Sequence, residues 1–386
     1  MKQRVLIAFV LFLVPIASAQ VYTVTDLGPL SPTAINIWGQ VVGNFKGQAF
    51  MWTQFTGRKG LGTLTGGTSS YASSINDLGA VTGTADGLGT VISPDASIPN
   101  QECSDLTQPF LWTPRNGMQG LGTVGVPPTE IMWPYWCGIP FYATGINDPR
   151  QVVGYTIPYS DLYQWGFLST SAVTTLFGSS FPPTMVNGVS NTGRLVGQTG
   201  VLIGQATSWK SGVATDLGAL GGGALDYSSS ANGVNDRGQV VGWSTTIPLD
   251  PDCHLDLVGC PIHAVLWGRN GGISDLGTLP GDTLSAASNI NFFGQVIGSS
   301  GSTLVGQGWG GPGGSGFQGD GGAVAVIGRP FIWSTRNGMQ DLNSLISTNS
   351  GWVLNSANGI NIWGQIVGSG TLNGHAHGFL LTPTVF

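Results

Sequence analysis

The sequence predicts an all-β protein: a seven-bladed β-propeller of four-stranded blades in which the N-terminal strand closes the last blade. Three observations support this: a nine-residue phrase occurs seven times, the composition favours turns over helices, and one repeat unit is divided between the chain ends. The 386 residues include 63 Gly and 22 Pro but only 8% charged residues, which leaves little material for the polar faces of amphipathic helices. An all-helical fold is therefore excluded.

The repeated phrase has the form Ile-Asn-x-x-Gly-Gln-Val-Val-Gly. An apolar strand end, Asn or Ser opening a type I turn, Gly at the fourth turn position and a β-branched run together predict a β-hairpin. The copies begin at Ile35, Ile75, Ile146, Val189, Val234, Ile290 and Ile360. The third copy carries Pro149-Arg150 at the end of the turn, and the fourth has Ser190 in place of Asn. Because Arg is costly in a left-handed conformation, we expect the third turn to be reshaped.

Two further phrases complete each unit and predict how the ring closes. A short apolar strand, usually ending in Trp, follows the hairpin, and a strand centred on Asp-Leu-Gly follows in six units. The seventh such strand is Tyr22 to Gly28, ahead of the first hairpin, whereas the last unit stops after Gly378 to Leu381. A ring explains both facts, because the N-terminal strand can pair as the outer strand of the last blade and leave no open edge. A linear β-solenoid is the rival fold, but it would have capping ends instead of a divided unit.

The recurring Trp side chains are predicted to pack between strands or blades, at Trp52, Trp112, Trp209, Trp267 and Trp333.

Residues 1–19 have the pattern of a secretory signal peptide, with Lys2 and Arg4, an apolar run, and Ala17-Ser18-Ala19 at its end. The run is too short to span a bilayer. We therefore expect residues 20–386 to form one secreted, monomeric domain, extracellular or periplasmic and not inserted in a membrane.

Of the 13 Lys and Arg residues two lie in the leader, which leaves 11 against 19 acidic residues and no basic cluster. Nucleic acid is therefore excluded as a partner, because its binding relies on a positive patch.

Successive hairpins begin 40 to 71 residues apart, and a core blade needs about 40 to 45, so the surplus must lie in loops. The surplus falls at residues 84–108, 125–142, 246–262 and 299–329. Because strands alternate in direction, all four insertions should emerge on one face of the ring, opposite the tight turns. Loops elaborated on one face of a rigid scaffold are where binding or catalysis usually resides.

The sequence favours a non-catalytic interaction module that binds a protein or glycan through this long-loop face. The repeat does not explain six aromatic residues in or beside the insertions, and these are the candidate ligand-binding residues: Trp133, Tyr135, Trp136, Tyr159, Tyr163 and Trp309. The alternative is an extracellular polysaccharide hydrolase or lyase, for which Glu102 and Glu130 would be the acids beside loop aspartates. No catalytic residue is assigned, because no nucleophile elbow occurs in the chain.

Four cysteines in an exported chain predict two disulfides. Cys103 with Cys137 could join adjacent loops on one face, and Cys253 with Cys260 could close a local loop; this is one of three connectivities. A zinc site at Cys253, His254, Cys260 and His263 is disfavoured, because the spacing matches no common ligand pattern. Calcium at Asp250, Asp252 and Asp256 is disfavoured too, because the closing Glu of a calcium loop is absent. We therefore expect no metal and no cofactor.

The combination of Asp-Leu-Gly, Ile-Asn-x-x-Gly-Gln-Val-Val-Gly and His-Ala-Phe-like phrases resembles the HAF family of bacterial extracellular repeat proteins. The resemblance covers essentially residues 20–386, although only His263-Ala264-Val265 and His377-Gly378-Phe379 approach the triplet that names the family. It implies an exported repeat protein and supplies no catalytic residues.

Overall fold

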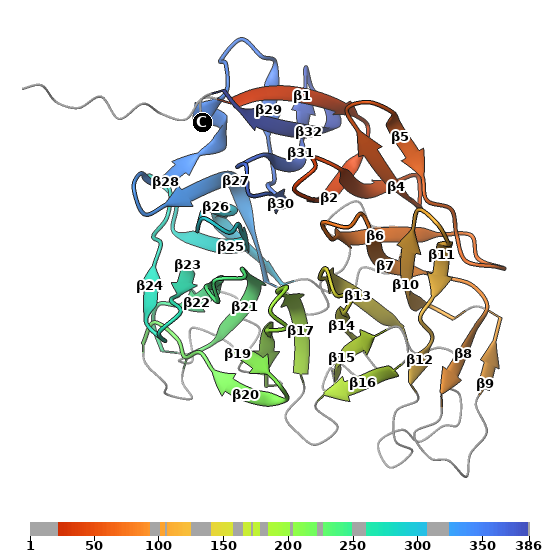
Figure 1. Cartoon of the computed structure of the whole chain (residues 1–386). Coiled ribbons are helices and arrows are strands. Elements are labelled where there is room, and N and C mark those ends of the chain that lie inside the picture. The colour runs from red at the N-terminus through yellow and green to blue at the C-terminus, as the bar shows by residue number, and fades with distance from the viewer. Residues whose placement is uncertain are drawn as a thin grey trace, which may run out of the picture.

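The computed structural model shows seven four-stranded antiparallel blades arranged around a central axis (Figure 1). It describes residues 22–92, 101–104, 106–124, 140–156, 165–170, 173–177, 184–200, 204–221, 227–248, 260–306 and 324–384. The seven-bladed propeller predicted from the sequence is confirmed. No helix in these segments is both long enough and apolar enough to cross a membrane.

Each blade follows the order of the chain from the innermost strand outward. Blade 1 contains β2 (Ser31–Ile35), β3 (Val41–Phe45), β4 (Gln48–Thr53) and β5 (Gly57–Gly60), and blade 2 contains β6 (Ser70–Ile75), β7 (Val81–Ala85), β10 (Gln108–Thr113) and β11 (Gly117–Gly120). Blade 3 contains β13 (Phe141–Ile146), β14 (Val152–Thr156), β15 (Trp165–Thr170) and β16 (Val173–Phe177), and blade 4 contains β17 (Thr184–Val189), β18 (Leu195–Thr199), β19 (Gln205–Lys210) and β20 (Val213–Asp216). Blade 5 contains β21 (Ser229–Val234), β22 (Val240–Thr245), β23 (Ile262–Trp267) and β24 (Ile273–Asp275), and blade 6 contains β25 (Leu284–Ile290), β26 (Val296–Gly306), β27 (Val324–Ser334) and β28 (Gly338–Asp341).

Blade 7 is assembled from both ends of the described chain. Its inner strand is split into β29 (Trp352–Leu354) and β30 (Gly359–Ile360), which both pair with β31 (Ile366–Leu372), and β32 (His375–Pro383) follows. The outer strand is β1 (Tyr22–Gly28), antiparallel to β32 from Tyr22 opposite Pro383 to Gly28 opposite Gly378. The predicted closure of the ring by Tyr22 to Gly28 is therefore confirmed. A short 3-10 helix, η2 (Leu342–Leu345), connects blade 6 to blade 7.

Glycine at the end of the repeated phrase has a steric cause. In blade 2 a Cβ built on Gly83 would lie 1.8 Å from the carbonyl oxygen of Tyr71 on the neighbouring inner strand. Real Cβ atoms never come so close to backbone, so a side chain here would push the inner two strands apart. The phrase ends in Gly because its inner strands approach closely at that point.

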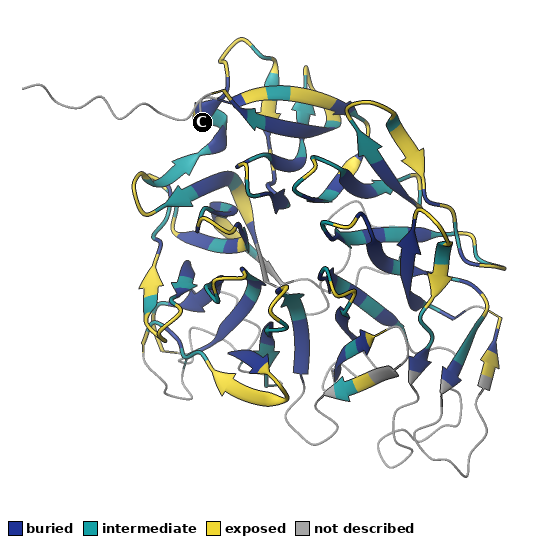
Figure 2. Ribbon diagram, viewed as in Figure 1, coloured by how far each residue is buried: buried dark blue, intermediate teal, exposed yellow. Residues whose placement is uncertain are grey.

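The cores lie between neighbouring blades, where apolar strands of one sheet face the next. One cluster joins Val42 and Met51 of blade 1 to Ile75, Phe110 and Trp112 of blade 2, all of them buried. Figure 2 shows largely buried strands and exposed residues in the short loops at the inner ends of the blades. The recurring Trp side chains pack into these clusters as predicted, from fully buried Trp267 to partly buried Trp52 and Trp333.

Hydrogen bonds across blade boundaries add to this packing. The inner strands of blades 1 to 6 each carry a β-bulge, and in five of them the bulged side chain donates to a carbonyl of the next blade. In blade 7 a residue between β29 and β30 makes the corresponding bond. The donors and acceptors are Thr33 to Ala72, Thr144 to Val186, Asn187 to Ala231, Asn232 to Ala287, Ser288 to Ala357 and Asn358 to Pro32. The last of these crosses the point where the ring closes.

The third hairpin turn corrects one expectation. Arg150 adopts φ 62°, close to the 71° of Gly39, and its amide donates to the Asn147 carbonyl at 2.9 Å as in the other turns. The turn is therefore not reshaped. Both flanks of this turn are fixed by strand pairing, and the surrounding structure holds Arg in a backbone region that costs a single residue about 1 to 3 kcal/mol.

The insertions are partly structured. The segment between β7 and β10 contains β8 (Gly89–Ile92) and β9 (Gln101–Cys103), which join β12 (Thr123–Val124) in a small separate sheet. The insertion of blade 6 lengthens its central hairpin, in which pairing continues to Gly306 opposite Val324. Because the strands of each blade are antiparallel, these connections leave from the face opposite the repeated hairpin turns.

Candidate binding site at the mouth of the ring

The seven repeated turns meet around the axis on one face, which we call the mouth. In each turn the residue at phrase position two is buried, with side chains 2 to 5% exposed at Asn36, Asn76, Asn147, Ser190, Asn235, Asn291 and Asn361. The Oδ1 of Asn361 accepts from the amides of Trp363 and Gln365, both at 3.0 Å, and its Nδ2 donates to Gln365 Oε1 at 2.8 Å. A short polar side chain that can donate and accept is what this tight turn needs.

The same Asn side chains link the blades into a circle. Nδ2 of each Asn donates to the carbonyl oxygen at position two of the next blade, at 2.9 to 3.1 Å. Six of the seven junctions have this bond, and the circle closes from Asn361 back to Asn36 at 3.0 Å. The junction from blade 4 to blade 5 lacks it, because Ser190 is too short. This Asn ring holds the turns at fixed positions around the axis.

The turns enclose a cavity of about 210 Å³ whose lining comes from phrase positions one to three of all seven blades. Apolar side chains at position one form its wall, and position three differs from blade to blade. The two residues at positions three and four are Ile-Trp, Asp-Leu, Asp-Pro, Asn-Thr, Asp-Arg, Phe-Phe and Ile-Trp in blades 1 to 7. The character of the mouth is therefore set by these variable pairs.

Blades 2 to 5 place polar side chains at position three, and we call this set the carboxylate arc: Asp77, Asp148, Asn191 and Asp236. Each accepts a backbone amide from the preceding blade through Oδ1. The donors are Ile37 to Asp77 at 3.1 Å, Asp77 to Asp148 at 2.9 Å, Asp148 to Asn191 at 2.8 Å and Asn191 to Asp236 at 2.7 Å. These bonds orient the carboxylates and connect the blades a second time.

The carboxylates of the arc are close enough to affect one another. Burial raises the pKa of the Asp77 carboxyl above its ordinary value, the charges of Asp148 and Asp236 raise it further, and the hydrogen bond from the Ile37 amide opposes the change. Among the described residues no ion pair joins these three carboxylates to a basic side chain. The turns of blades 3 to 5 also carry Arg150, Arg194 and Arg237, so this side of the mouth holds three carboxylates that are not ion-paired to these nearby basic side chains.

Blades 6, 7 and 1 place aromatic side chains at the mouth, and we call this set the aromatic arc: Phe292, Phe293, Trp363 and Trp38. Their exposed fractions are 42%, 64%, 52% and 73%. The indole nitrogens are nevertheless bonded, because Trp363 Nε1 donates to the Ile37 carbonyl at 2.9 Å and Trp38 Nε1 to the Asp77 carbonyl at 2.8 Å. The rings are held in place by their edges while their faces remain in solvent.

Two neighbours extend the aromatic arc at its ends. Phe292 and Phe293 contact each other edge to face with centroids 5.5 Å apart, and the Arg237 guanidinium lies 5.0 Å from the Phe292 centroid. Leu78 of blade 2 is 64% exposed beyond Trp38. Singly exposed apolar residues are ordinary, whereas several large ones on neighbouring turns are typical of interaction surfaces.

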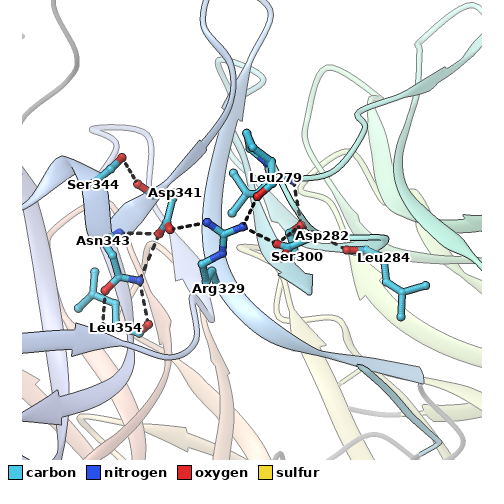
Figure 3. A network of polar contacts seen from close by, with 10 residues as sticks. Leu279, Asp282, Leu284, Ser300, Arg329, Asp341, Asn343, Ser344 and Leu354 are labelled. Atoms are coloured by element: carbon cyan, nitrogen blue, oxygen red, sulfur yellow. Dashed lines mark hydrogen bonds and ion pairs between the residues drawn. The ribbon is translucent and has the colours of Figure 1, made fainter. Parts of the chain in front are cut away.

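A second polar cluster, away from the mouth, joins blade 6 to blade 7 and to the connection between β24 and β25 (Figure 3). Arg329 of β27 donates to Asp282 at 2.9 Å, to the Pro280 carbonyl at 3.0 Å and to Asp341 at 3.2 Å. Asp341 in turn accepts from Asn343, whose amide group bonds to Leu354 of blade 7. The hydrogen bond and charge of Asp282 raise the pKa of Arg329, so this clamp keeps its positive charge.

The histidines of the His-Ala-Phe-like triplets each pair with an Asp side chain in their own blade. His263 Nδ1 lies 2.9 Å from Asp275, and His377 Nδ1 lies 2.8 Å from Asp26. Both carboxylates belong to an Asp-Leu-Gly phrase and also accept the amide of its Gly, so each pair connects the two outer strands of a blade. The described residues contain no group of three or more His, Cys, Asp and Glu placed to hold a metal ion.

The six aromatic residues predicted to bind a ligand all fall outside the described residues: Trp133, Tyr135, Trp136, Tyr159, Tyr163 and Trp309. So do Glu130, Cys137 and Cys253. Glu102 is exposed, and its Oε1 accepts from Thr90. Cys103 and Cys260 are buried, and neither is a free thiol. The pairing of the four cysteines stays a prediction.

The arcs at the mouth were not predicted from the sequence, although a signal for them exists. Positions three and four of the phrase vary in chemistry while the positions around them stay constant. A turn whose frame is fixed needs no particular residue at two exposed positions. Some copies carry aromatic residues at these positions and others carry acidic residues. This variation therefore indicates a surface that is aromatic on one side and acidic on the other.

Several solved structures are similar to this chain over most of its length. No family model matches the chain, and no curated protein matches it. Among solved structures, virginiamycin B lyase from Staphylococcus aureus is similar at 8% identity and TM-score 0.49, over 93% of this chain and 99% of that one. An oligogalacturonate lyase in complex with manganese is similar at 11% identity and TM-score 0.48, over 95% of both chains. The β-propeller domain of the Trilobed protease from Pyrococcus furiosus is similar at 8% identity and TM-score 0.42, over 94% of this chain and 95% of that one.

Proposed function

We propose that this chain is a secreted, non-catalytic interaction module that binds a protein or glycan partner at the mouth of its propeller. The observation that carries the proposal is the pair Trp38 and Trp363, whose indole N–H groups are bonded to the next blade while more than half of each side chain is exposed. A ring fixed in this way loses little conformational freedom when a partner covers it. Trp is also among the residues that contribute most to binding at interfaces.

The composition of the mouth supports binding rather than chemistry. The cavity of about 210 Å³ is lined by Asp77, Asp148 and Asp236 on one side and by Ile37, Phe292 and Ile362 on the other, and Trp38 and Trp363 are exposed in the adjoining turns. A partner with apolar and polar parts could use both sides. The Oδ1 atoms of the acids are engaged by backbone amides of neighbouring turns. Binding through the long-loop face, which the sequence favoured, stays a prediction, because its six candidate residues fall outside the described residues; the mouth lies on the opposite face.

A binding screen with matched variants tests the proposal. The protein that starts at Gln20 would be applied to a glycan array and to a surface-displayed peptide library, beside a Trp38→Ala, Trp363→Ala double variant. We expect the double variant to bind the selected ligand at least about tenfold more weakly, because tenfold corresponds to about 1.4 kcal/mol and a single interface Trp can contribute about 2 kcal/mol.

The control variant is Phe55→Ala. Phe55 is 94% exposed and lies in the β4–β5 turn, which belongs to the same face of the ring but to its outer edge. Its replacement should leave binding unchanged. Equal binding by the wild-type protein and the double variant would refute the mouth as the binding site.

A further inference from the structure

We infer that the mouth recognises a basic side chain, a Lys ammonium or an Arg guanidinium, presented with adjacent apolar residues by a segment of a partner protein. This inference rests on the proposed function and names the chemistry of its ligand. The cation would lie against the carboxylate arc, and the apolar residues beside it would cover the faces of Trp38 and Trp363.

The first argument is charge. Three of the four residues of the carboxylate arc are Asp. The same turns carry Arg150, Arg194 and Arg237, but none of these forms an ion pair with the three Asp among the described side chains: Arg194 donates to Ser208 and Arg237 lies against Phe292. The Oδ1 atoms of Asp77 and Asp148 accept backbone amides, and no described group bonds their Oδ2 atoms. A cation at the mouth would therefore find carboxylate oxygens that are already oriented, and it would offset the repulsion between them.

The second argument comes from the aromatic arc. Arg237 of blade 5 places its guanidinium 5.0 Å from the centroid of Phe292, so one aromatic face of the mouth already takes a cation from the chain itself. The faces of Trp363 and Trp38 have no such partner among the described residues and are the better cation–π acceptors by type. A basic side chain of a partner could pack against these Trp faces in the way that the Arg237 guanidinium packs against Phe292.

The third argument separates a basic peptide from a neutral glycan. Stacking on Trp faces would serve either ligand, but only a cation gains from three carboxylates that repel each other. A neutral sugar would have to lie among those charges without compensating them. The pairing of an apolar arc with a negative arc therefore favours a basic residue on an apolar segment.

The test uses three short peptides: acetyl-Leu-Lys-Leu-amide, acetyl-Leu-Arg-Leu-amide and acetyl-Leu-norleucine-Leu-amide. Their affinities for the protein that starts at Gln20 would be measured by ligand-observed NMR in low salt. We expect the Lys or the Arg peptide to bind at least tenfold more tightly than the norleucine peptide, which keeps the apolar stem and lacks the charge. The better of the two shows which cation the site prefers, and its advantage should shrink as salt is added.

Asn191 shows which substitution removes the carboxylate charge and keeps the hydrogen bond between blades. Asn191 accepts the Asp148 amide through Oδ1 just as Asp148 accepts the Asp77 amide, so Asn at this position preserves the bond between blades. We therefore expect the Asp77→Asn, Asp148→Asn double variant to fold and to lose the advantage of the basic peptides at least tenfold. Asp216→Asn is the matched control, because Asp216 is exposed on β20 and, within the described part of the chain, its side chain bonds only the Gly218 amide of its own turn.

The outcomes separate this inference from the proposed function. Equal binding of the basic and norleucine peptides, or an unchanged advantage in the Asp77→Asn, Asp148→Asn variant, would overturn the inference. A glycan that binds wild type, and fails to bind the Trp38→Ala, Trp363→Ala variant, while basic peptides do not bind, would overturn the inference and leave the proposed function standing. Failure of both ligand classes would overturn both.

Discussion

The carboxylate arc and the aromatic arc both connect the turns of neighbouring blades by hydrogen bonds, but with opposite roles for the side chain. In the carboxylate arc, the side chain at position three accepts an amide from the blade before it, as Asp148 does from Asp77 at 2.9 Å. In the aromatic arc, the side chain at position four donates to a carbonyl of the blade after it, as Trp363 does to Ile37 at 2.9 Å. The repeated frame therefore tolerates two kinds of junction, and the resulting surface has carboxylates on one side and large apolar side chains on the other.

Deleting the strand that closes the ring should cause the largest loss of stability, and it should affect the aromatic arc more than the carboxylate arc. Deletion of Tyr22 to Gly28 takes away β1, whose Tyr22 and Leu27 are 3% and 6% exposed, and uncovers the edge of β32 in blade 7. At about 1.5 to 3 kcal/mol for each buried side chain, the free energy of unfolding should fall by about 3 to 6 kcal/mol. Thermal unfolding followed by Trp fluorescence would measure the loss.

The damage should fall on blade 7, which carries Trp363, and spare blades 2 to 5. Hydrogen exchange of the turn amides would then increase in the aromatic arc before the carboxylate arc. An unchanged unfolding temperature would contradict the structural importance of the closure.

Replacing a member of the Asn ring should cost more than replacing a member of either arc. Asn361→Ala removes the acceptor of two part-buried amides, the donor to Gln365 Oε1, and one of the two donors to the Asn36 carbonyl, which keeps only the Gly39 amide. We expect a loss of about 3 to 5 kcal/mol in the free energy of unfolding, because unsatisfied buried polar groups cost about 1 to 3 kcal/mol each. Chemical denaturation would measure it.

Asn191→Ala provides the comparison within the carboxylate arc. Asn191 is exposed, and its side chain bonds the Asp148 amide and Asp236. Its removal should cost about 1 kcal/mol. Equal losses in the two variants would show that the Asn ring does not hold the mouth together.

The carboxylate arc should also make stability depend on pH in a particular direction. Because folding raises the pKa of Asp77, the native chain binds a proton more readily than the unfolded chain. Stability should therefore fall as the pH rises from the ordinary Asp pKa through the raised one. Asp77→Asn should be more stable than wild type at neutral pH, and the difference should vanish below the ordinary pKa.

Unfolding midpoints measured across this pH range would show the effect. Asn191→Asp supplies the converse, since a fourth carboxylate should lower stability at neutral pH and not in acid. Parallel pH profiles for wild type and Asp77→Asn would contradict the account of repulsion within the arc.

The smallest expected effect is a gain at the one junction where the Asn ring is broken. Ser190→Asn could donate to the Asn235 carbonyl as the other six Asn residues do to their neighbours, and the Gly193 amide already makes the common turn bond to Ser190. A buried hydrogen bond of this kind contributes about 0.5 to 1.5 kcal/mol. Chemical denaturation beside wild type would measure the gain. A loss of stability would show that blade 4 does not admit the larger side chain.

Much of the fold could be predicted from the sequence because its elements are local. An apolar strand end, an Asn turn and a closing Gly predict a hairpin wherever they occur, and seven copies with one strand displaced to the N-terminus predict a closed ring. The small sheet of β8, β9 and β12 was not predicted, because β12 pairs in parallel with a strand some thirty residues away. The left-handed Arg150 was mispredicted for a related reason: its cost is local, and the pairing that holds it comes from elsewhere.

The candidate site shows the same division. The sequence by itself determined the seven turns, the buried Asn that organises each one and the strand that closes the ring, since each follows from hydrogen bonds and steric limits within a few residues. Only the tertiary structure decided that the variable pairs meet around one cavity, that three acids lie together and that two Trp side chains are held by the next blade. Those contacts join residues about 40 to 326 positions apart, and no local preference can specify which turns become neighbours.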